Sequence, residues 1–310
     1  LQNLLHSFLL IAAMILLLCA VGYFVAGWTG LFSFGIIWLG VSLLAPRLSP
    51  TMLLTFYNAR PLLPSEAPIL FQHLSELARR AGLPCLPRLY YVPSRIANAF
   101  SMGTCNDAVI GLTDGLFRTL NIREITAVIA HEISHIANND VRVMGIADFI
   151  SRSTHFFSLI GQISLILNFP LLLFHQSTIP WGAILLLIFA PTISGLLQLA
   201  LSRTREFEAD LDAARITGDP EGLSSALQKL DIAQKSFLKR IFFPGLGEGD
   251  PSLLRTHPPT EERIRRLMEL REELPLQEPI SFIEELVLPE DLFPPQLRPP
   301  SWRIITGLWH

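Results

Sequence analysis

Charged side chains are missing from two long parts of the chain. No Asp, Glu, Lys or Arg occurs in residues 1–46 or in residues 153–202 of the 310-residue sequence. Only 16% of all residues are charged, against about 25% in an ordinary soluble domain. The two uncharged runs exclude a fully soluble enzyme, and the charged remainder excludes a chain that lies in lipid throughout.

The sequence also has few cysteines and no excess of positive charge. The three cysteines, Cys19, Cys85 and Cys105, form no C-x-x-C pair. A disulfide framework is therefore not expected, and a reducing compartment fits better. The net charge of −3 excludes the basic surface of a nucleic-acid-binding domain, so no nucleic-acid partner is expected.

The two uncharged runs predict two transmembrane hairpins. About 20 apolar residues cross the hydrocarbon core of a bilayer. The first run divides at a Gly-Trp-Thr-Gly turn and the second at residues 175–180, which gives four spans: 4–26, 31–45, 156–174 and 181–201. The alternative for the first segment is a cleavable signal peptide, which needs a basic region before it and a soluble continuation.

Basic residues lie at one end of each hairpin. The turns hold no Lys or Arg, whereas the opposite ends carry Arg47, Arg142, Arg152, Arg203 and Arg205. Because positive charge concentrates on the cytoplasmic side of membrane proteins, the charged domain is expected to face the cytoplasm.

An H-E-x-x-H motif lies on a strongly predicted helix. Asn121 and Glu124 have the spacing of a capping box, and apolar residues then recur at helical intervals. Because His131 and His135 are one turn apart, both imidazoles can bind one Zn²⁺. Glu132 points beside the metal and can act as the general base for an attacking water.

A third protein ligand is required, with one position left open. Glu206 and Asp210 lie four residues apart in the segment 203–210. Glu206 can bind the metal while Asp210 orients a ligating histidine. From spacing alone, Glu208 remains a rival ligand and a solvated acidic helix face remains the plain alternative. If the last span continues as a helix, Glu206 lies about 7.5 Å beyond the hydrocarbon edge.

Four segments resemble the HtpX-type membrane zinc peptidases, which are relatives of the CAAX prenyl proteases. They are N-A-F-S-M-G at 98–103, H-E-I-S-H-I-A-N-N-D at 131–140, S-R-T-R-E-F-E-A-D at 202–210 and T-H-P-P-T-E-E-R-I at 256–264. The resemblance covers about residues 5–272. It implies an endopeptidase with one Zn²⁺ per chain, and it implies Glu206 as the third ligand.

The resemblance also implies a biological role and a location. The expected substrates are proteins or peptides, above all damaged membrane proteins, at the inner membrane of a prokaryotic cell. A CAAX-type processing protease is the nearest alternative, although those enzymes have more spans than this sequence shows. A catalytically silent zinc scaffold and a transporter are further alternatives. Glu132 and the absence of charged residues within the spans disfavour them.

The segment that begins at Asn98 is expected to bind substrate. Asn98, Ala99 and Phe100 lie between two expected strands, 89–92 and 108–112. An extended peptide can pair there through its backbone whatever its side chains are. A structural turn is the equal alternative for Asn98.

Two residues of the last matching segment are expected to assist the reaction. His257 can stabilise the oxyanion, and its alternative is a packing residue at the entrance of the helix 260–271. Arg263 can position His257 or Asp210.

The expected fold is mainly α with a small β-sheet, in an integral membrane protein with a cytoplasmic zincin-like domain. The expected parts are a transmembrane hairpin, the first half of the catalytic domain, a second hairpin, the second half of the catalytic domain and a Pro-rich extension: 1–48, 49–152, 153–202, 203–274 and 275–310.

Overall fold

The computed structural model describes residues 2–44, 54–55, 58–174, 181–242 and 259–273, with positions 278, 280, 302–303 and 308–309. His257 and most of the 275–310 extension lie outside these residues. The chain forms two compact units. We call Leu1–Leu48, Asn138–Leu211 and Gly249–Arg263 the helical unit, and Ser49–Ala137, Asp212–Glu248 and Ile264–His310 the sheet unit. The fold is mainly helical with one small mixed sheet, as predicted.

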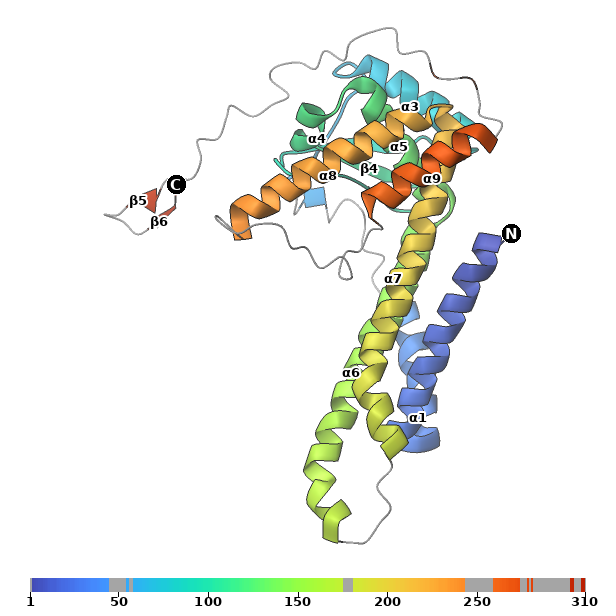
Figure 1. Cartoon of the computed structure of the whole chain (residues 1–310), viewed down its shortest axis with the longest axis vertical. Helices are drawn as coiled ribbons and strands as arrows, with labels where there is room; N and C mark the ends of the chain where they lie inside the picture. The colour runs from blue at the N-terminus through green and yellow to red at the C-terminus, as the bar shows by residue number, and fades with distance from the viewer. Residues whose placement is uncertain are drawn as a thin grey trace. The chain divides into compact units, whose positions relative to one another are not determined.

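Three long helices form the helical unit. They are α1 (Gln2–Leu44), α6 (Asp140–Phe174) and α7 (Trp181–Thr217), whose residues from Asp212 onward belong to the sheet unit. α1 packs along α6 (Figure 1). Apolar side chains such as Met14, Ala147 and Leu201 are buried between the helices, while large apolar residues such as Leu16 face outward.

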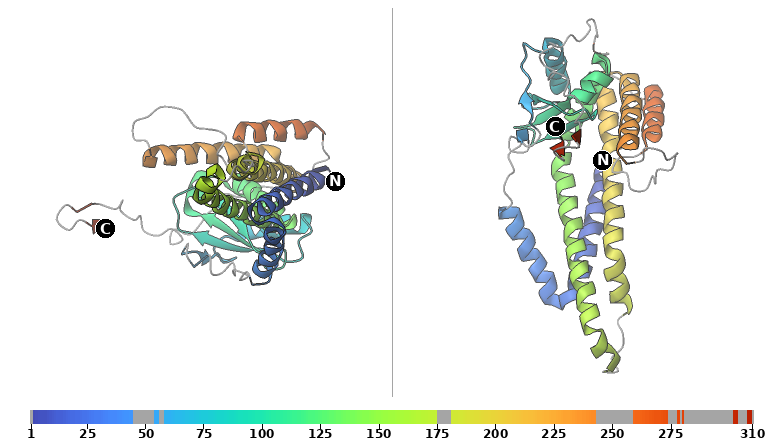
Figure 2. Two further views of the ribbon diagram at one scale, coloured as in Figure 1. Left: turned by 90° about the horizontal axis from the view of Figure 1, so that it is seen from below. Right: turned by 90° about the vertical axis from the view of Figure 1, so that its left-hand side faces the viewer.

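α1 is bent where the first hairpin turn was predicted. Ala26 and Gly27 leave the helical region, and Gly27 has a φ of +59°, which glycine adopts without the strain of a Cβ atom. The bend divides α1 into two limbs, which are visible in the right-hand view of Figure 2. The turn was expected at residues 27–30, so it begins one residue earlier.

Two described helices are long and apolar enough to cross a membrane, Leu5–Gly30 and Trp181–Thr217. These match the first and the last expected spans. α7 continues without interruption past Leu201 and Glu206, as the expectation for the last span required. The other two expected spans include side chains outside the described set.

Pro191 lies inside α7 and breaks its hydrogen-bond pattern. Because proline has no N–H, the carbonyl of Leu187, four residues earlier, loses its helical donor. Two side chains of α6 replace it: Gln162 Nε2 donates to this carbonyl at 2.9 Å, and the Ser158 hydroxyl also donates to it. In a helix that crosses a membrane such replacement is required, since lipid offers no donor.

A four-stranded sheet forms the centre of the sheet unit. Its order is β1 (Arg60–Pro61), β2 (Arg88–Val92), β4 (Val109–Thr113) and β3 (Ala99–Met102). β2 and β4 are parallel, and the other pairs are antiparallel. β2 and β4 confirm the two expected strands. β3 was not predicted as a strand, and it forms an edge of the sheet.

Helices pack around this sheet. They are α3 (Pro68–Arg80), α4 (Asp114–Thr119), α5 (Ile122–Ala137) and α8 (Pro220–Phe242), and α9 (Thr260–Glu273) contributes Leu267 to the core. α5 packs on α3, α8 and β3. The strands β5 (Trp302–Arg303) and β6 (Leu308–Trp309) pair with each other near the end of the chain.

Candidate metal centre

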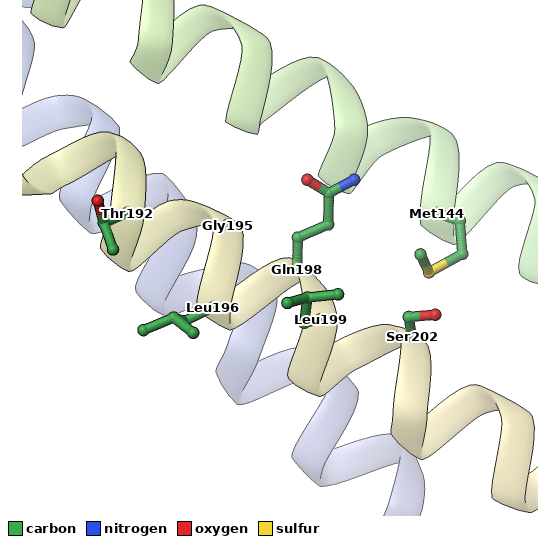
Figure 3. A pocket seen from close by; sticks show the side chains of 7 residues that line it. All are labelled: Met144, Thr192, Gly195, Leu196, Gln198, Leu199 and Ser202. Carbon is green, nitrogen blue, oxygen red and sulfur yellow. The ribbon is translucent and has the colours of Figure 1, made fainter. Parts of the chain in front are cut away.

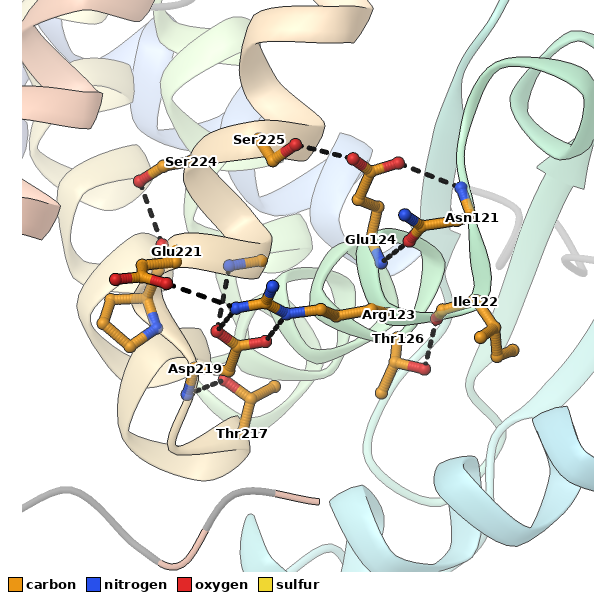
Figure 4. A network of polar contacts seen from close by, with 12 residues as sticks. Asn121, Ile122, Arg123, Glu124, Thr126, Thr217, Asp219, Glu221, Ser224 and Ser225 are labelled. Carbon is orange, nitrogen blue, oxygen red and sulfur yellow. Dashed lines mark hydrogen bonds and ion pairs between the residues drawn. The ribbon is translucent and has the colours of Figure 1, made fainter. Parts of the chain in front are cut away.

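The start of α5 is fixed by two polar networks (Figure 4). The predicted capping box is confirmed: the Glu124 N–H donates to Asn121 Oδ1, and the Asn121 N–H donates to Glu124 Oε2, both at 2.9 Å. Glu124 also accepts hydrogen bonds from Ser225 and Lys229 of α8. Beside it, the Arg123 guanidinium forms two hydrogen bonds to Asp219 at 2.6 and 2.7 Å. The helix that carries the motif is therefore held firmly against α8.

This network shifts the acidity of Glu124. Burial acts to raise the pKa of its carboxyl, but the hydrogen bonds from Lys229, Ser225 and the Asn121 N–H outweigh burial and lower the pKa below its ordinary value. The same balance of burial and hydrogen bonding, from Arg123 and the Gly222 N–H, lowers the pKa of Asp219. Both carboxylates are charged at neutral pH.

The two histidines of the motif lie together on one face of α5. Their Nε2 atoms are 3.1 Å apart, and their ring planes meet edge to face. His131 is buried and His135 is half-buried. Glu132 is buried beside them, with 8% of its surface exposed. The helical spacing alone predicted this pairing of imidazoles.

In the helical unit, Glu206 belongs to a cluster of three charged side chains. The Arg263 guanidinium donates two hydrogen bonds to Asp210, each 2.6 Å long, and its Nη1 lies 3.2 Å from Glu206 Oε2. All three residues are buried. Asp210 follows Glu206 by one turn of α7. Arg263 therefore contacts two carboxylates on the same face of the helix.

Glu208, the rival ligand, has a different environment. Its carboxylate accepts a hydrogen bond from Arg205 Nη1 at 2.5 Å. Arg205 is itself buried and also pairs with Asp140, in the first turn of α6. The Glu208 carboxylate thus shares Arg205 with Asp140, in an ion-pair cluster that joins α6 and α7.

His131, His135 and Glu206 form a group that can hold a metal ion. Each offers one ligand atom, and these atoms all lie within 4.8 Å of one another. Two nitrogens bound to one tetrahedral Zn²⁺ at about 2.0–2.1 Å would be about 3.3 Å apart, close to the observed 3.1 Å. Two imidazoles and one carboxylate are also a donor set that zinc accepts.

The three expected substrate-binding residues lie at the edge of the sheet. Asn98 directly precedes β3, and its backbone is fixed by Thr113: its N–H donates to Thr113 Oγ1 at 2.9 Å, and its carbonyl accepts from the Thr113 hydroxyl at 2.8 Å. Its side chain is exposed. Ala99 and Phe100 are part of β3, and the Phe100 ring covers Gly111, where any Cβ would lie 2.5 Å from Phe100 Cζ.

The ion pair between Asp140 and Arg205 was not predicted. Both residues lie in the segments that carried the family resemblance, so the signal was present. The residues are 65 positions apart, and spacing in sequence does not show which distant charges meet. His257 lies outside the described residues, so its expected role stays a prediction.

Comparison with known proteins identifies the family. The model for peptidase family M48 matches residues 64–271. A protease HtpX homolog of Acaryochloris marina is 37% identical over 76% of this chain and 83% of its own length. A protease HtpX homolog of Pyrococcus abyssi is 36% identical over 86% of this chain and 95% of its own length.

A solved structure shows a related fold. The crystal structure of S. mikatae Ste24p matches with a TM-score of 0.51 and 23% identity, over 86% of this chain. The chain spans 65% of that structure's length. The family match covers more than half of the sequence, and the two relatives match over 83% and 95% of their own length. This chain is a membrane metallopeptidase that belongs to peptidase family M48.

Proposed function

We propose that the chain is a zinc-dependent endopeptidase of the H-E-x-x-H…E type, which cleaves misfolded or damaged membrane proteins. His131, His135 and Glu206 are its metal ligands. The observation that carries this proposal is the approach of their three ligand atoms to within 4.8 Å. Glu206 is preferred to Glu208 because the Glu206 carboxylate lies within 4.8 Å of the ligand atoms of both histidines, whereas the Glu208 carboxylate is held by Arg205.

The three ligand residues fit one zinc ion and leave one coordination position open. Three protein ligands leave the fourth site open for substrate, which distinguishes a catalytic site from a structural one. When bound, zinc supplies Lewis acidity at the scissile carbonyl. The remaining steps belong to the side chains of this chain.

Glu132 is the general base. Its carboxylate is buried next to His131 on α5, which keeps it from being solvated by bulk water. It takes a proton from the water that attacks the peptide carbonyl, and it then delivers that proton to the leaving amine. The peptide C–N bond breaks, the new C–O bond forms, and Glu132 returns to its starting charge.

Four other residues bind or position the reacting groups. Asp210 and Arg263 act on the ligands: the two hydrogen bonds between them hold Asp210 on the face of α7 that carries Glu206. Asn98 and the edge strand β3 bind the substrate, whose backbone adds a further strand to the sheet. His257 stabilises the oxyanion.

The proposed topology follows from the sequence of the helical unit. Four spans in two hairpins place the charged parts of the chain in the cytoplasm, because the basic residues flank the hairpins on that side. The metal centre then lies at the cytoplasmic surface of the inner membrane, where segments of membrane proteins emerge.

The test combines metal content with peptide cleavage. The full-length protein is purified in detergent with zinc, and zinc per chain is measured beside cleavage of casein. Glu206→Ala is expected to lose the metal and the activity. Glu132→Gln is expected to keep one zinc per chain and to lose turnover by at least about a hundredfold, the usual contribution of a general base.

Glu208→Ala is the matched control, since it removes the neighbouring carboxylate of the same helix. It should keep the metal. Stoichiometric zinc in Glu206→Ala, or loss of zinc in Glu208→Ala, would move the third ligand away from Glu206. Undiminished cleavage by Glu132→Gln would remove Glu132 as the base.

A further inference from the structure

A groove lies between α6 and α7 in the helical unit (Figure 3). It has a volume of about 460 Å³. Met144 of α6 points into it, and most of its lining comes from α7, including Thr192, Gly195, Gln198 and Ser202. All of these residues are uncharged, and the α7 residues lie in the charge-free run 153–202. The groove therefore shares no residue with the metal centre, and the proposed reaction does not use it.

The groove follows the face of α7 that leads to the metal centre. Thr192, Gly195 and Ser202 recur at intervals of three and seven residues, and Glu206 follows Ser202 by one further turn. Residues at such intervals lie on one side of a helix. From Thr192 to Ser202 the groove covers about 15 Å of helix, about half the thickness of the hydrocarbon core. Its end is about 6 Å along the same helix from the third ligand.

Gln198 gives the groove a polar character that lipid chains do not match. Among the described residues, its side-chain amide makes no hydrogen bond, and Figure 3 shows it extending from α7 toward α6. A primary amide offers both a donor and an acceptor. An acyl chain has neither, whereas a peptide group has both. A polypeptide that is unwound inside a membrane needs such partners for its own backbone.

We propose that this groove docks the membrane-embedded end of a substrate's hydrophobic segment, in a locally unwound form, and delivers it along α7 to the metal centre. Gln198 pairs with a backbone amide of that segment, and the apolar lining accepts its side chains. The proposal rests on the proposed function, because it names the route by which a membrane substrate reaches the same site.

The test fills the groove and compares two substrates. Zinc-loaded full-length protein is reconstituted into liposomes with a single-span test protein whose cytoplasmic tail begins at the membrane, and casein cleavage is measured in parallel. In Gly195→Leu the new side chain enters open space, since a Cβ at Gly195 meets no atom within 4 Å. Gly182→Leu is the matched control: its Cβ also meets nothing within 4 Å, but it does not line the groove.

In Gly195→Leu, the KM for the single-span substrate is expected to rise about tenfold, because excluding one or two methylene groups from a groove has that magnitude. The ratio of single-span to casein cleavage falls by the same factor. Gln198→Leu lowers this ratio in the same direction, and Gly182→Leu leaves both rates unchanged. A photoreactive residue in place of Leu199 cross-links to the substrate span.

The outcomes separate the two proposals. If wild-type protein with zinc cleaves neither substrate, the proposed function fails. If wild type cleaves both, but the ratio is the same in Gly195→Leu and Gly182→Leu, the groove proposal fails alone. A cross-link to lipid in place of the substrate span also overturns it, in favour of a lipid site.

Discussion

The helical unit and the sheet unit satisfy their buried polar groups in different ways. In the sheet unit, Asp219 is buried, but its partner Arg123 has 44% of its side chain exposed. Glu124 is likewise paired with a Lys229 that reaches solvent. In the helical unit, Arg205 and Asp140 retain only 5% and 3% of their side-chain exposure. Ser158 and Gln162 serve a carbonyl that Pro191 has freed within α7.

The two units differ in what can replace the partner of a buried polar group once that partner is removed. When a half-exposed lysine or arginine is removed, water can enter the place that it leaves beside the buried carboxylate, so part of the lost interaction is replaced. A buried group that loses its partner keeps the full cost of desolvation. We therefore expect the loss of one buried polar contact to lower the free energy of unfolding more in the helical unit than in the sheet unit.

The largest expected effect is the loss of Arg205. Arg205→Met removes the guanidinium that pairs with the buried Asp140, and the free energy of unfolding should fall by about 3–5 kcal/mol. Arg123→Met in the sheet unit should cost less, about 1–3 kcal/mol, because Asp219 keeps its hydrogen bond from the Gly222 N–H and water can take the place of the half-exposed guanidinium. Denaturant titration of the detergent-solubilised protein measures both.

A double variant makes this comparison sharper. Asp140→Leu combined with Arg205→Met removes both charges, and it should regain most of the stability lost in the single variant. If Arg205→Met and Arg123→Met cost the same, the two units do not differ in the way described.

The second effect concerns the carbonyl of Leu187. Ser158→Ala with Gln162→Leu removes both of its donors, and an unsatisfied buried acceptor costs about 1–3 kcal/mol. Adding Pro191→Ala supplies a backbone N–H four residues after Leu187, which can donate to that carbonyl within the helix. The triple variant should therefore be more stable than the double variant.

The same Pro191→Ala change in the wild-type background serves as the control. There the carbonyl already has two donors, so the gain should be smaller. Equal gains in the two backgrounds would mean that Ser158 and Gln162 do not compensate for Pro191. Thermal unfolding in detergent is sufficient for this comparison.

What could be predicted from the sequence depended on local spacing. The capping box at Asn121 and Glu124, the imidazole pair of His131 and His135, and the continuation of α7 through Glu206 all follow from helical geometry over a few residues. Two of the four strands of the central sheet were also visible as short apolar runs. These features need no knowledge of distant parts of the chain.

The contacts that were missed join distant segments. β3 pairs with β4 only because the sheet brings them together, and its short sequence carries no strong strand pattern. The replacement of the Pro191 hydrogen bond depends on α6. In the extension, Ile280 is buried in the core, and Arg80 donates to the carbonyl of Glu278, although composition predicted only a Pro-rich extension. No local rule specifies these partners.

The third effect is a dependence of stability on pH in the sheet unit. The pKa of Glu124 is lowered by folding, so the folded state binds fewer protons than the unfolded chain. Its contribution is complete above the unfolded pKa of about 4.3 and is lost as the pH falls through the lower, folded value. Glu124→Gln should reduce stability at pH 7 by about 1–2 kcal/mol.

That difference between Glu124→Gln and wild type should shrink as the pH falls below about 4. Glu269→Gln is the control, because Glu269 and its partner Arg265 are both largely exposed. A gap between Glu124→Gln and wild type that is constant from pH 7 to pH 3 would show that the carboxylate charge does not contribute.

The smallest expected effect tests whether the cost of losing an ion pair depends on its burial or on the unit in which it lies. Asp148 and Arg152 form an ion pair of 2.7 Å on α6, in the helical unit, but 46% and 79% of their side chains are exposed. If burial decides the value of an ion pair, Asp148→Ala should change the free energy of unfolding by no more than about 0.5 kcal/mol. A loss near that of Arg205→Met would show instead that any charge in the helical unit is costly to unpair. Measured together, the two variants show whether burial or location sets the difference between the units.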